Sequence, residues 1–417
     1  MEPASIEPLV DPAGWALLAQ LPPYDPAQAL ALGTALRDTG LDADLVAAAL
    51  TQSRLRARAV AKFGDLAQDM LFTPEGLEQA TRLTVAARHA HRFRTAGATH
   101  VADLGCGIGA DSMALAGLGM RVLAVERDPA TAMVASINLR QLPEARVVTG
   151  DAFDADLTGI DGVWADPARR TTSGRRLHEL ADYSPAVDRL LELRTRIPRV
   201  GLKLGPGLAH RDIPSDAHAQ WLSVGGDVVE ANLWFGDLAP EGAGRSALVI
   251  DGAGTGTTLA EAGNPADAVE QADAGPLGSY LYEPDGAVIR AGLVARVARD
   301  LGGHLIDPTI AYVTTPTLAA TPFATAFRVL DHMPFSLKRL KTYLRERGVG
   351  VLEIKKRGSA LDPARLRTQL ALRGDASATI VLTRIAGAPR VLVVERPAPT
   401  GPTTPDPPSP AVPSEES

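Results

Sequence analysis

From Thr99 onward the sequence alternates short apolar runs with segments of helical character. The runs are HVADL, RVLAVE, ARVVTGD, DGVWADP and RVGLKLG, between residues 100 and 205. They are continuously apolar and do not alternate with polar residues, as strands covered on both faces require. The intervals between them leave room for crossover helices, so the pattern predicts a parallel sheet of the α/β class.

The whole chain has 417 residues, enough for about two to four domains, and the segments outside this sheet pattern differ from it in composition. Apolar residues at helical spacing predict an N-terminal helical region over 1–98. We expect the sheet domain over 99–251, with SVGGDVVEANLWFG and RSALVID forming an antiparallel hairpin at its end. The remaining expectations are a flexible linker over 252–279, which is rich in Gly, Ala and Asp, an α+β unit over 280–397, and a disordered Pro-rich tail over 398–417.

A glycine-rich turn follows the first predicted strand in VADLGCGIGAD. It places Asp103 ahead of Gly105, Gly107 and Gly109, and the next strand ends in Glu126. Glycine lets a backbone bend tightly and approach a ligand closely. An acid at the tip of the second strand can accept both hydroxyls of a ribose, so the pattern predicts a nucleoside-containing cofactor.

Two cofactors compete for this pattern. A dinucleotide site requires the spacing G-x-G-x-x-G and a helix N-terminus directed at a pyrophosphate. Here the spacing is G-x-G-x-G, and Asp103 would repel a pyrophosphate. The acid suits the cationic amino-acid end of S-adenosylmethionine, and the pattern resembles the first motif of the class I S-adenosylmethionine-dependent methyltransferases.

That resemblance extends over about residues 70–251 and implies a Rossmann-like, seven-stranded methyltransferase sheet. It also implies roles for residues that occur in the family's order. Those implied to bind S-adenosylmethionine are Asp103, Gly105, Gly107, Gly109, Glu126 and Asp151.

The resemblance assigns catalysis to Asp166 and Pro167 in the sequence VWADPARR. In relatives that methylate amino groups, an acid or amide side chain and a backbone carbonyl orient the accepting nitrogen. Ala168 and Arg169 stand where such relatives have a second proline and an aromatic ring. Arg169 and Arg170 can bind a substrate phosphate or stack on a base, although a solvated arginine-rich loop is the alternative.

The segment DMLFTPEGLEQA, residues 69–80, is similar to the one before the glycine motif in RNA guanine methyltransferases of the trimethylguanosine-synthase type. In that family a Thr-Pro-Glu turn opens a helix that closes over the cofactor. The resemblance makes Phe72 a candidate cofactor contact. Thr73, Pro74 and Glu75 equally fit a capped structural helix.

The C-terminal α+β unit resembles the THUMP-like domain that accompanies class I methyltransferases in bacteria, through LKRLKTYLRERGVGVLEIKKRG and LRTQLALRGDASATIVLTRI. Residues 335–373 carry eleven Lys and Arg against three Asp and Glu, although the whole chain has a formal charge of −7. Lys338, Lys341 and Lys356 are therefore candidate RNA-binding residues. A merely solvated basic face is the alternative.

Other function classes lack support in the sequence. A single cysteine, Cys106, fits a reducing cytoplasm, and we expect no membrane segment and no metal site. The sequence thus predicts a methyltransferase that acts on a base nitrogen in tRNA or other RNA, with guanine favoured. The alternatives are a methyltransferase for a small molecule or protein, and a catalytically inactive RNA-binding module of the same fold.

Overall fold

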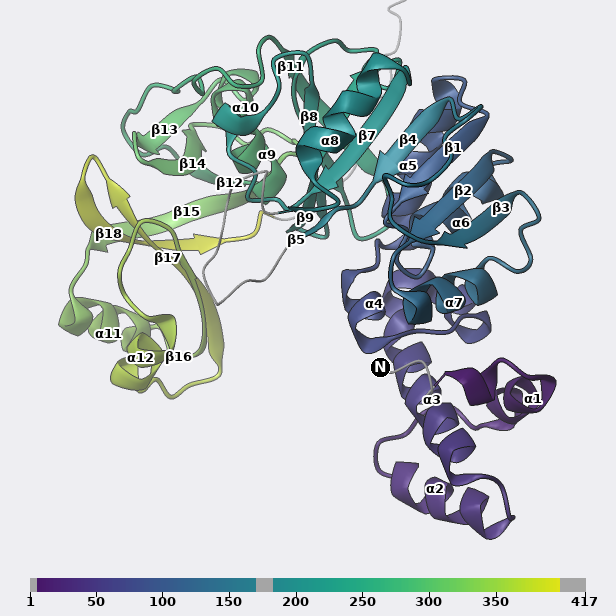
Figure 1. Ribbon diagram of the computed structural model, residues 1–417. Coiled ribbons are helices and arrows are strands. Elements are labelled where there is room, and N and C mark those ends of the chain that lie inside the picture. The colour runs from purple at the N-terminus through teal and green to yellow at the C-terminus, as the bar shows by residue number, and fades with distance from the viewer. Residues whose placement is uncertain (1–5, 170–182, 398–417) are drawn as a thin grey trace, which may run out of the picture. The chain divides into compact units, whose positions relative to one another are not determined.

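The computed structural model describes residues 6–169 and 183–397 and divides the chain into two compact units (Figure 1). Unit 1 comprises Met1–Val269 and Gly286–Leu293, and unit 2 comprises Glu270–Asp285 and Val294–Ser417. The chain therefore leaves unit 1 after residue 269 and contributes one further short helix to it, α9 (Gly286–Ala291), before it continues in unit 2.

Helices form the first part of unit 1. They are α1 (Pro12–Gln20), α2 (Ala29–Asp38), α3 (Ala43–Phe63), α4 (Pro74–Gln79) and α5 (Leu83–Thr95), with the 3-10 turns η2 (Glu7–Leu9) and η3 (Gly64–Asp69). The longest, α3, begins at Asp42, whose side chain accepts hydrogen bonds from the Asp44 and Leu45 amides. Apolar side chains of these helices share one cluster with Ile108 and Val134. The helical region therefore packs against the glycine turn, which holds Ile108, and against the helix that contains Val134.

Five strands of unit 1 run parallel. They are β1 (His100–Leu104), β2 (Arg121–Glu126), β3 (Ala145–Thr149), β4 (Gly162–Ala165) and β7 (Arg199–Leu204). The helices that follow strands are α6 (Ala110–Gly117), α7 (Pro129–Asn138) and α8 (Val187–Glu192), with the turns η5 (Leu193–Thr195) and η6 (His210–Asp212). Side chains of α5, α6 and α7 pack with those of β1 and β2 in one cluster. Because the strands are parallel, the residues that follow them lie along one edge of the sheet.

Four more strands complete this sheet: β8 (His218–Val224), β9 (Asp227–Gly236), β10 (Gly244–Ile250) and β11 (Gly256–Ala262). The strand order is β11-β10-β8-β9-β7-β4-β1-β2-β3, and β9 is antiparallel to both β7 and β8. The seven strands from β8 to β3 form the predicted methyltransferase-type sheet, which confirms the fold class. Strands β10 and β11 extend it at one edge.

Two local expectations about this edge are wrong. Strands β9 and β10 form no hairpin, because β8 lies between them and pairs with β9 antiparallel and with β10 parallel. Strand β11 lies within 252–279, where a flexible linker was expected, and it pairs with β10 along seven residues. An edge strand needs little apolar surface, and only Leu259 of β11 is buried, so its composition concealed it.

Unit 2 contains a seven-stranded sheet of order β13-β14-β12-β15-β18-β17-β16. Its strands are β12 (Tyr280–Pro284), β13 (His304–Asp307), β14 (Ile310–Thr315), β15 (Ala324–Pro334), β16 (Val349–Lys356), β17 (Ala376–Ile385) and β18 (Ala388–Glu395), and its helices are α10 (Val294–Asp300), α11 (Leu337–Glu346) and α12 (Pro363–Leu370). Leu340 and Leu344, one turn apart on α11, are fully buried in the cluster that includes β16–β18. The cations of α11 consequently lie on its other faces.

Candidate active site

The loop between β1 and α6 carries three glycines at positive φ. The φ angles of Gly105, Gly107 and Gly109 are 92°, 55° and 91°, which residues with a side chain rarely adopt. The amides of Gly105 and Cys106 both donate to the Val125 carbonyl of β2, at 2.9 and 3.0 Å. The loop is thereby tied to the neighbouring strand and presents a bare backbone at the edge of the sheet.

A cavity of 490 Å³ lies at the carboxyl ends of the parallel strands. The four predicted acids at or just after the ends of β1 to β4 all line it, together with two of the predicted glycines: Asp103, Gly105, Gly107, Glu126, Asp151 and Asp166. Gly109 forms the N-cap of α6, and Pro167 is buried next to Asp166. The structure thus brings together residues from four separate strand ends.

The two acids on the β2 and β3 side are fixed by backbone amides. Glu126 accepts from the Gly107 amide at 3.0 Å through Oε2 and from the Asp128 amide at 2.9 Å through Oε1. Asp151 accepts from the Phe153 amide at 2.9 Å. Each carboxylate oxygen has more than one lone pair, so both side chains can accept further hydrogen bonds from a ligand.

The surroundings of Asp103 disfavour the charged form of its carboxyl group. Its side chain is almost fully buried, and Oδ2 accepts from the Ser112 hydroxyl at 2.5 Å. Burial and the neighbouring Asp111 carboxylate raise the pKa of Asp103 to about 8, although the Ser112 bond opposes the rise. A cation that enters the cavity would favour the charged form of this acid.

The segment from Thr73 to Thr81 forms one wall of the cavity. Thr73 caps α4 by accepting from the Gly76 amide at 2.9 Å, and Pro74 occupies the first helical position. At the other end of α4, the Lys62 ammonium donates to three backbone carbonyls, those of Leu77, Glu78 and Ala80, at 2.7–2.8 Å. The helix is therefore held at both ends beside the cavity.

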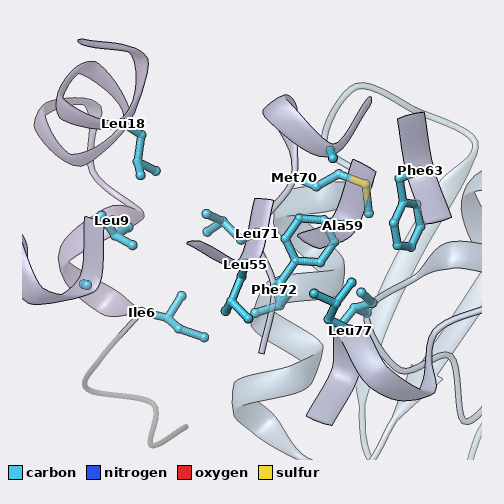
Figure 2. Close-up of a cluster of buried hydrophobic side chains, with 14 of the residues drawn as sticks. Ile6, Leu9, Leu18, Leu55, Ala59, Phe63, Met70, Leu71, Phe72 and Leu77 are labelled. Atoms are coloured by element: carbon cyan, nitrogen blue, oxygen red, sulfur yellow. The ribbon is translucent and has the colours of Figure 1, made fainter. Parts of the chain in front are cut away.

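Phe72 does not line this cavity, contrary to the expectation that it contacts the cofactor. Its ring is fully buried and packs against Phe63, with ring centroids 5.6 Å apart, in the helical cluster that Figure 2 shows. Gln52 accepts from the Phe72 amide at 3.0 Å and donates to its carbonyl at 2.8 Å. These two bonds fix the backbone so that the ring packs among the helices.

Asp166 follows β4 and forms an ion pair with Lys203 of β7. Lys203 Nζ lies 2.5 Å from Asp166 Oδ2, and 34% of the Asp166 side chain is exposed. Burial raises the pKa of Asp166, and the Lys203 ammonium opposes that rise. Of the predicted substrate contacts beyond it, only the backbone of Arg169 is described, in β5 (Ala168–Arg169), which pairs with β6 (Tyr183–Ser184). Arg170 lies outside the described residues.

A buried charge cluster that the sequence did not predict lies beside the cavity. The two ring nitrogens of His89 are each 2.7 Å from a carboxylate oxygen, one of Asp111 and one of Glu230. Burial opposes the charged form of the ring, but Glu230 and Asp111 outweigh it and raise the pKa of His89 to about 9. Thr81 donates to Asp111 at 2.7 Å and accepts from Lys203 at 2.9 Å, so its hydroxyl joins this cluster to the Asp166 pair.

The charges around the cavity distinguish between the two cofactors. Of the described residues that line it, seven have carboxyl side chains and one, Arg127, is a cation; the acids are Glu75, Asp103, Asp111, Glu126, Asp128, Asp151 and Asp166. Such a lining repels a diphosphate and favours a ligand with positive charge. A bare glycine backbone and acids at the strand ends therefore fit S-adenosylmethionine.

Comparison with known proteins agrees with this geometry. An uncharacterized S-adenosylmethionine-dependent methyltransferase of Mycobacterium tuberculosis, from strains CDC 1551 and H37Rv, is 36% identical over 340 residues, which are 79% of this chain and 90% of the relative. This chain belongs to the S-adenosylmethionine-dependent methyltransferases. A provisionally assigned methyltransferase from Porphyromonas gingivalis W83, 22% identical, matches the fold with a TM-score of 0.71 over 90% of this chain and 99% of that one.

Two segments of this methyltransferase match domain families. Residues 324–396 match the family described as THUMP domain-like, and residues 2–59 match a domain of unknown function, DUF8688. The first match confirms the predicted THUMP-like domain at the C-terminal end. None of the helices in the described part of the chain combines the length and the apolar character that spanning a membrane requires. That part of the chain also contains no group of three or more His, Cys, Asp and Glu side chains that could hold a metal ion.

The predicted basic residues of this methyltransferase divide into two sets in unit 2. Lys355 pairs with Glu283 at 2.9 Å, and Arg357 lies 3.7 Å from the same carboxylate. Lys338 is exposed on α11, whereas Lys341 and Lys356 donate only to the Gln369 and Leu361 carbonyls. Among the described residues, no carboxylate lies within ion-pair distance of Lys338, Lys341 or Lys356.

Proposed function

We propose that this methyltransferase transfers the methyl group of S-adenosylmethionine to a base nitrogen in RNA, with guanine in tRNA as the favoured acceptor. When it is bound, the cofactor supplies a methyl group on a positively charged sulfur. The residues of this chain bind the cofactor, orient the acceptor and supply the surface that recognises RNA.

Four acids hold the cofactor and the acceptor in this proposal, and three of them bind the cofactor. Asp103 faces its ammonium group, Glu126 accepts from the ribose hydroxyls, and Asp151 accepts from the amino group of adenine. The bonds that Glu126 and Asp151 accept from backbone amides support this assignment, because they fix both carboxylates before the ligand arrives. Gly105 and Gly107 keep side chains out of the space, and Gly109 starts the helix behind it.

Asp166, the fourth acid, orients the acceptor nitrogen together with Pro167. The acceptor's N–H group donates to the Asp166 carboxylate, so that the nitrogen lone pair points in line at the methyl carbon. The bound cofactor would supply the methyl group, its sulfur would keep the electron pair of the carbon–sulfur bond, and the accepting nitrogen would release one proton to water. Holding the nitrogen in line supplies much of the acceleration, because the leaving group is already good.

The unpaired cations of the THUMP-like domain carry the assignment to RNA. Six basic residues on α11, directly after α11 or on β16 have no carboxylate partner among the described residues: Lys338, Arg339, Lys341, Arg345, Arg347 and Lys356. Cations that are not neutralised by the protein are available to phosphates, whereas Glu283 already occupies Lys355 and Arg357. The guanine preference rests on the similarity of residues 69–80 to guanine methyltransferases, and α4 of that segment lines the cavity.

The test of the reaction is product identification. The protein is incubated with a labelled methyl donor and RNA from cells that lack its gene, and the RNA is digested to nucleosides. We expect label in a methylated guanosine. Label in another nucleoside would correct the base, and label confined to small molecules or protein would overturn the assignment to RNA.

The test of the RNA surface compares two triple variants. One combines Lys338→Ala, Lys341→Ala and Lys356→Ala. The other removes three cations of the same unit that have carboxylate partners, Arg296→Ala, Arg299→Ala and Arg328→Ala. In the lysine triple variant the fall of log tRNA affinity with log salt should become less steep. Its slope should decrease in magnitude by about 2, at ~0.7 for each phosphate that the protein no longer neutralises. Equal slopes in the two variants would contradict the proposed surface.

A further inference from the structure

Lys203 is a cation of unit 1 that lies beside the cavity lined by acids. It is the last residue but one of β7, and only 13% of its side chain is exposed. Its ammonium donates to Asp166 Oδ2 at 2.5 Å and to Thr81 Oγ1 at 2.9 Å. Asp166 and Thr81 both line the cofactor cavity, so Lys203 joins the wall after α4 to the acid after β4.

The surroundings of Lys203 keep it charged. Burial of an ammonium group lowers its pKa, but the Asp166, Glu230 and Asp111 carboxylates outweigh burial and raise the pKa of Lys203 above its ordinary value. A lysine that stays protonated can neither accept a proton nor act as a nucleophile. Its available role is to hold a neighbouring group by charge and hydrogen bonding.

Asp166 is that group. Lys203 occupies one of its two carboxylate oxygens, and among the described residues the other oxygen, Oδ1, has no hydrogen-bond partner. Without the ammonium, the carboxylate would lose its fixed orientation and the opposite charge that favours its ionised form. An acid that carries a proton has one fewer oxygen free to accept an N–H bond.

We propose that Lys203 is a positioning residue for methyl transfer: it holds Oδ2 of Asp166 so that Oδ1 accepts the N–H group of the methyl acceptor. This inference rests on the proposed function, because it takes Asp166 as the residue that orients the acceptor. It adds a residue from β7 that neither the sequence motifs nor the family comparisons assign. The rival explanation is that the ion pair only stabilises the sheet edge.

Arg199 is the matched control for that rival. It lies on the same strand as Lys203 and pairs with Asp237 at 3.1 Å, but it does not line the cavity. If the ion pair only stabilises the sheet, Lys203→Met and Arg199→Met should change thermal stability and kcat in the same way. If Lys203 positions Asp166, only Lys203→Met should change the titration midpoint of Asp166.

The first experiment needs no substrate. For the unmodified protein and for each variant, an infrared difference spectrum is taken against the same protein with Asp166→Asn added. The difference isolates the carboxyl band of Asp166, and a pH series gives the titration midpoint of that group. In Lys203→Met the midpoint should lie about one to three pH units above that of the unmodified protein, because an opposite charge has been removed. Arg199→Met and Lys203→Arg should leave it unchanged. An unshifted midpoint in Lys203→Met would overturn the proposal.

The second experiment separates turnover from binding. In Lys203→Met we expect kcat for RNA methylation to fall about 100-fold, the size of effect that a misplaced reacting group produces. Cofactor affinity by calorimetry should change by less than about threefold, since Lys203 is not proposed to touch the cofactor. Lys203→Arg should restore most of kcat, as the conservative variant keeps the charge. The proposal would also be overturned if Lys203→Met and Arg199→Met lost kcat to the same extent and in proportion to their loss of thermal stability.

The two experiments fail for different reasons. If the unmodified protein methylates no RNA, the proposed function fails, and the infrared titration still decides whether Lys203 controls Asp166. If RNA is methylated but the midpoint of Asp166 does not depend on Lys203, the proposed function stands and the positioning role fails.

Discussion

His89 and Glu230 meet inside unit 1 at 2.7 Å, although 141 positions separate them in the sequence. His89 comes from α5 and Glu230 from β9, and Asp111 of α6 binds the opposite ring nitrogen. The ring also lies 4.3 Å from the Trp164 ring, centroid to centroid. One charged imidazole thus ties the helical region to two separate parts of the sheet domain.

This arrangement predicts a pH-dependent stability. The pKa of His89 is raised from 6.5 to about 9, so its contribution is fully present below pH 6.5 and is lost as the pH rises through 9. The loss should amount to about 3 kcal/mol in the free energy of unfolding of unit 1. Urea titrations followed by tryptophan fluorescence measure it, since all four tryptophans lie in unit 1. The His89→Gln variant should be less stable at pH 6.5, and its difference from the unmodified protein should shrink by pH 10; a constant difference would contradict the assignment.

Cofactor binding should also depend on pH through Asp103. Its pKa is raised to about 8, so the acid largely carries a proton at pH 6 and must lose it to face an ammonium group. We expect the affinity for S-adenosylmethionine to rise from pH 6 to pH 7.5, by at most about tenfold per pH unit, with release of a proton on binding. Calorimetry in two buffers of different ionisation enthalpy measures both quantities. In Asp103→Asn the pH dependence should disappear, and a dependence that survives this change would have to come from another group.

Glu126 should contribute to binding of the donor and of its demethylated product alike. Glu126→Gln keeps the size of the side chain but removes the charge that holds the Gly107 and Asp128 amides and the proposed ribose hydroxyls. We expect both ligands to bind about tenfold more weakly, or ~1.4 kcal/mol. Glu144→Gln, at an exposed acid outside the cavity, is the control. A loss confined to the charged donor would point to a purely electrostatic role for Glu126.

Asn138 should be important for stability. Its amide accepts from the Leu71 amide at 2.8 Å and donates to the Leu71 and Ile108 carbonyls at 3.1 and 3.0 Å, all within buried surroundings. Asn138→Ala leaves these backbone groups without partners and should lower the free energy of unfolding of unit 1 by about 2 kcal/mol. Urea unfolding monitored by tryptophan fluorescence gives the value. Ser136→Ala, two residues earlier on the same helix, removes a single bond to the Ala132 carbonyl and should have a much smaller effect.

The sequence by itself determined where the cavity is and four of the seven acids that line it. Asp103, Glu126, Asp151 and Asp166 each lie at or just after the end of an apolar run, and parallel strands bring these ends to one edge. The glycine spacing and the adjacent acid also selected a cationic cofactor over a diphosphate. These inferences depend on short-range spacing and on the geometry of a parallel sheet, which few tertiary details can change.

Only the tertiary structure decided which buried partners complete the site. Lys203, Thr81, His89 and Glu230 stand in unremarkable helix and strand sequences, and their hydrogen bonds join residues between 22 and 141 positions apart. The direction of Phe72 and the place of β11 were also undetermined, because a side chain's apolar character does not say which neighbour covers it. Burial requires a charged group to find an opposite charge or a hydrogen bond, but the partner that provides it depends on how distant segments pack.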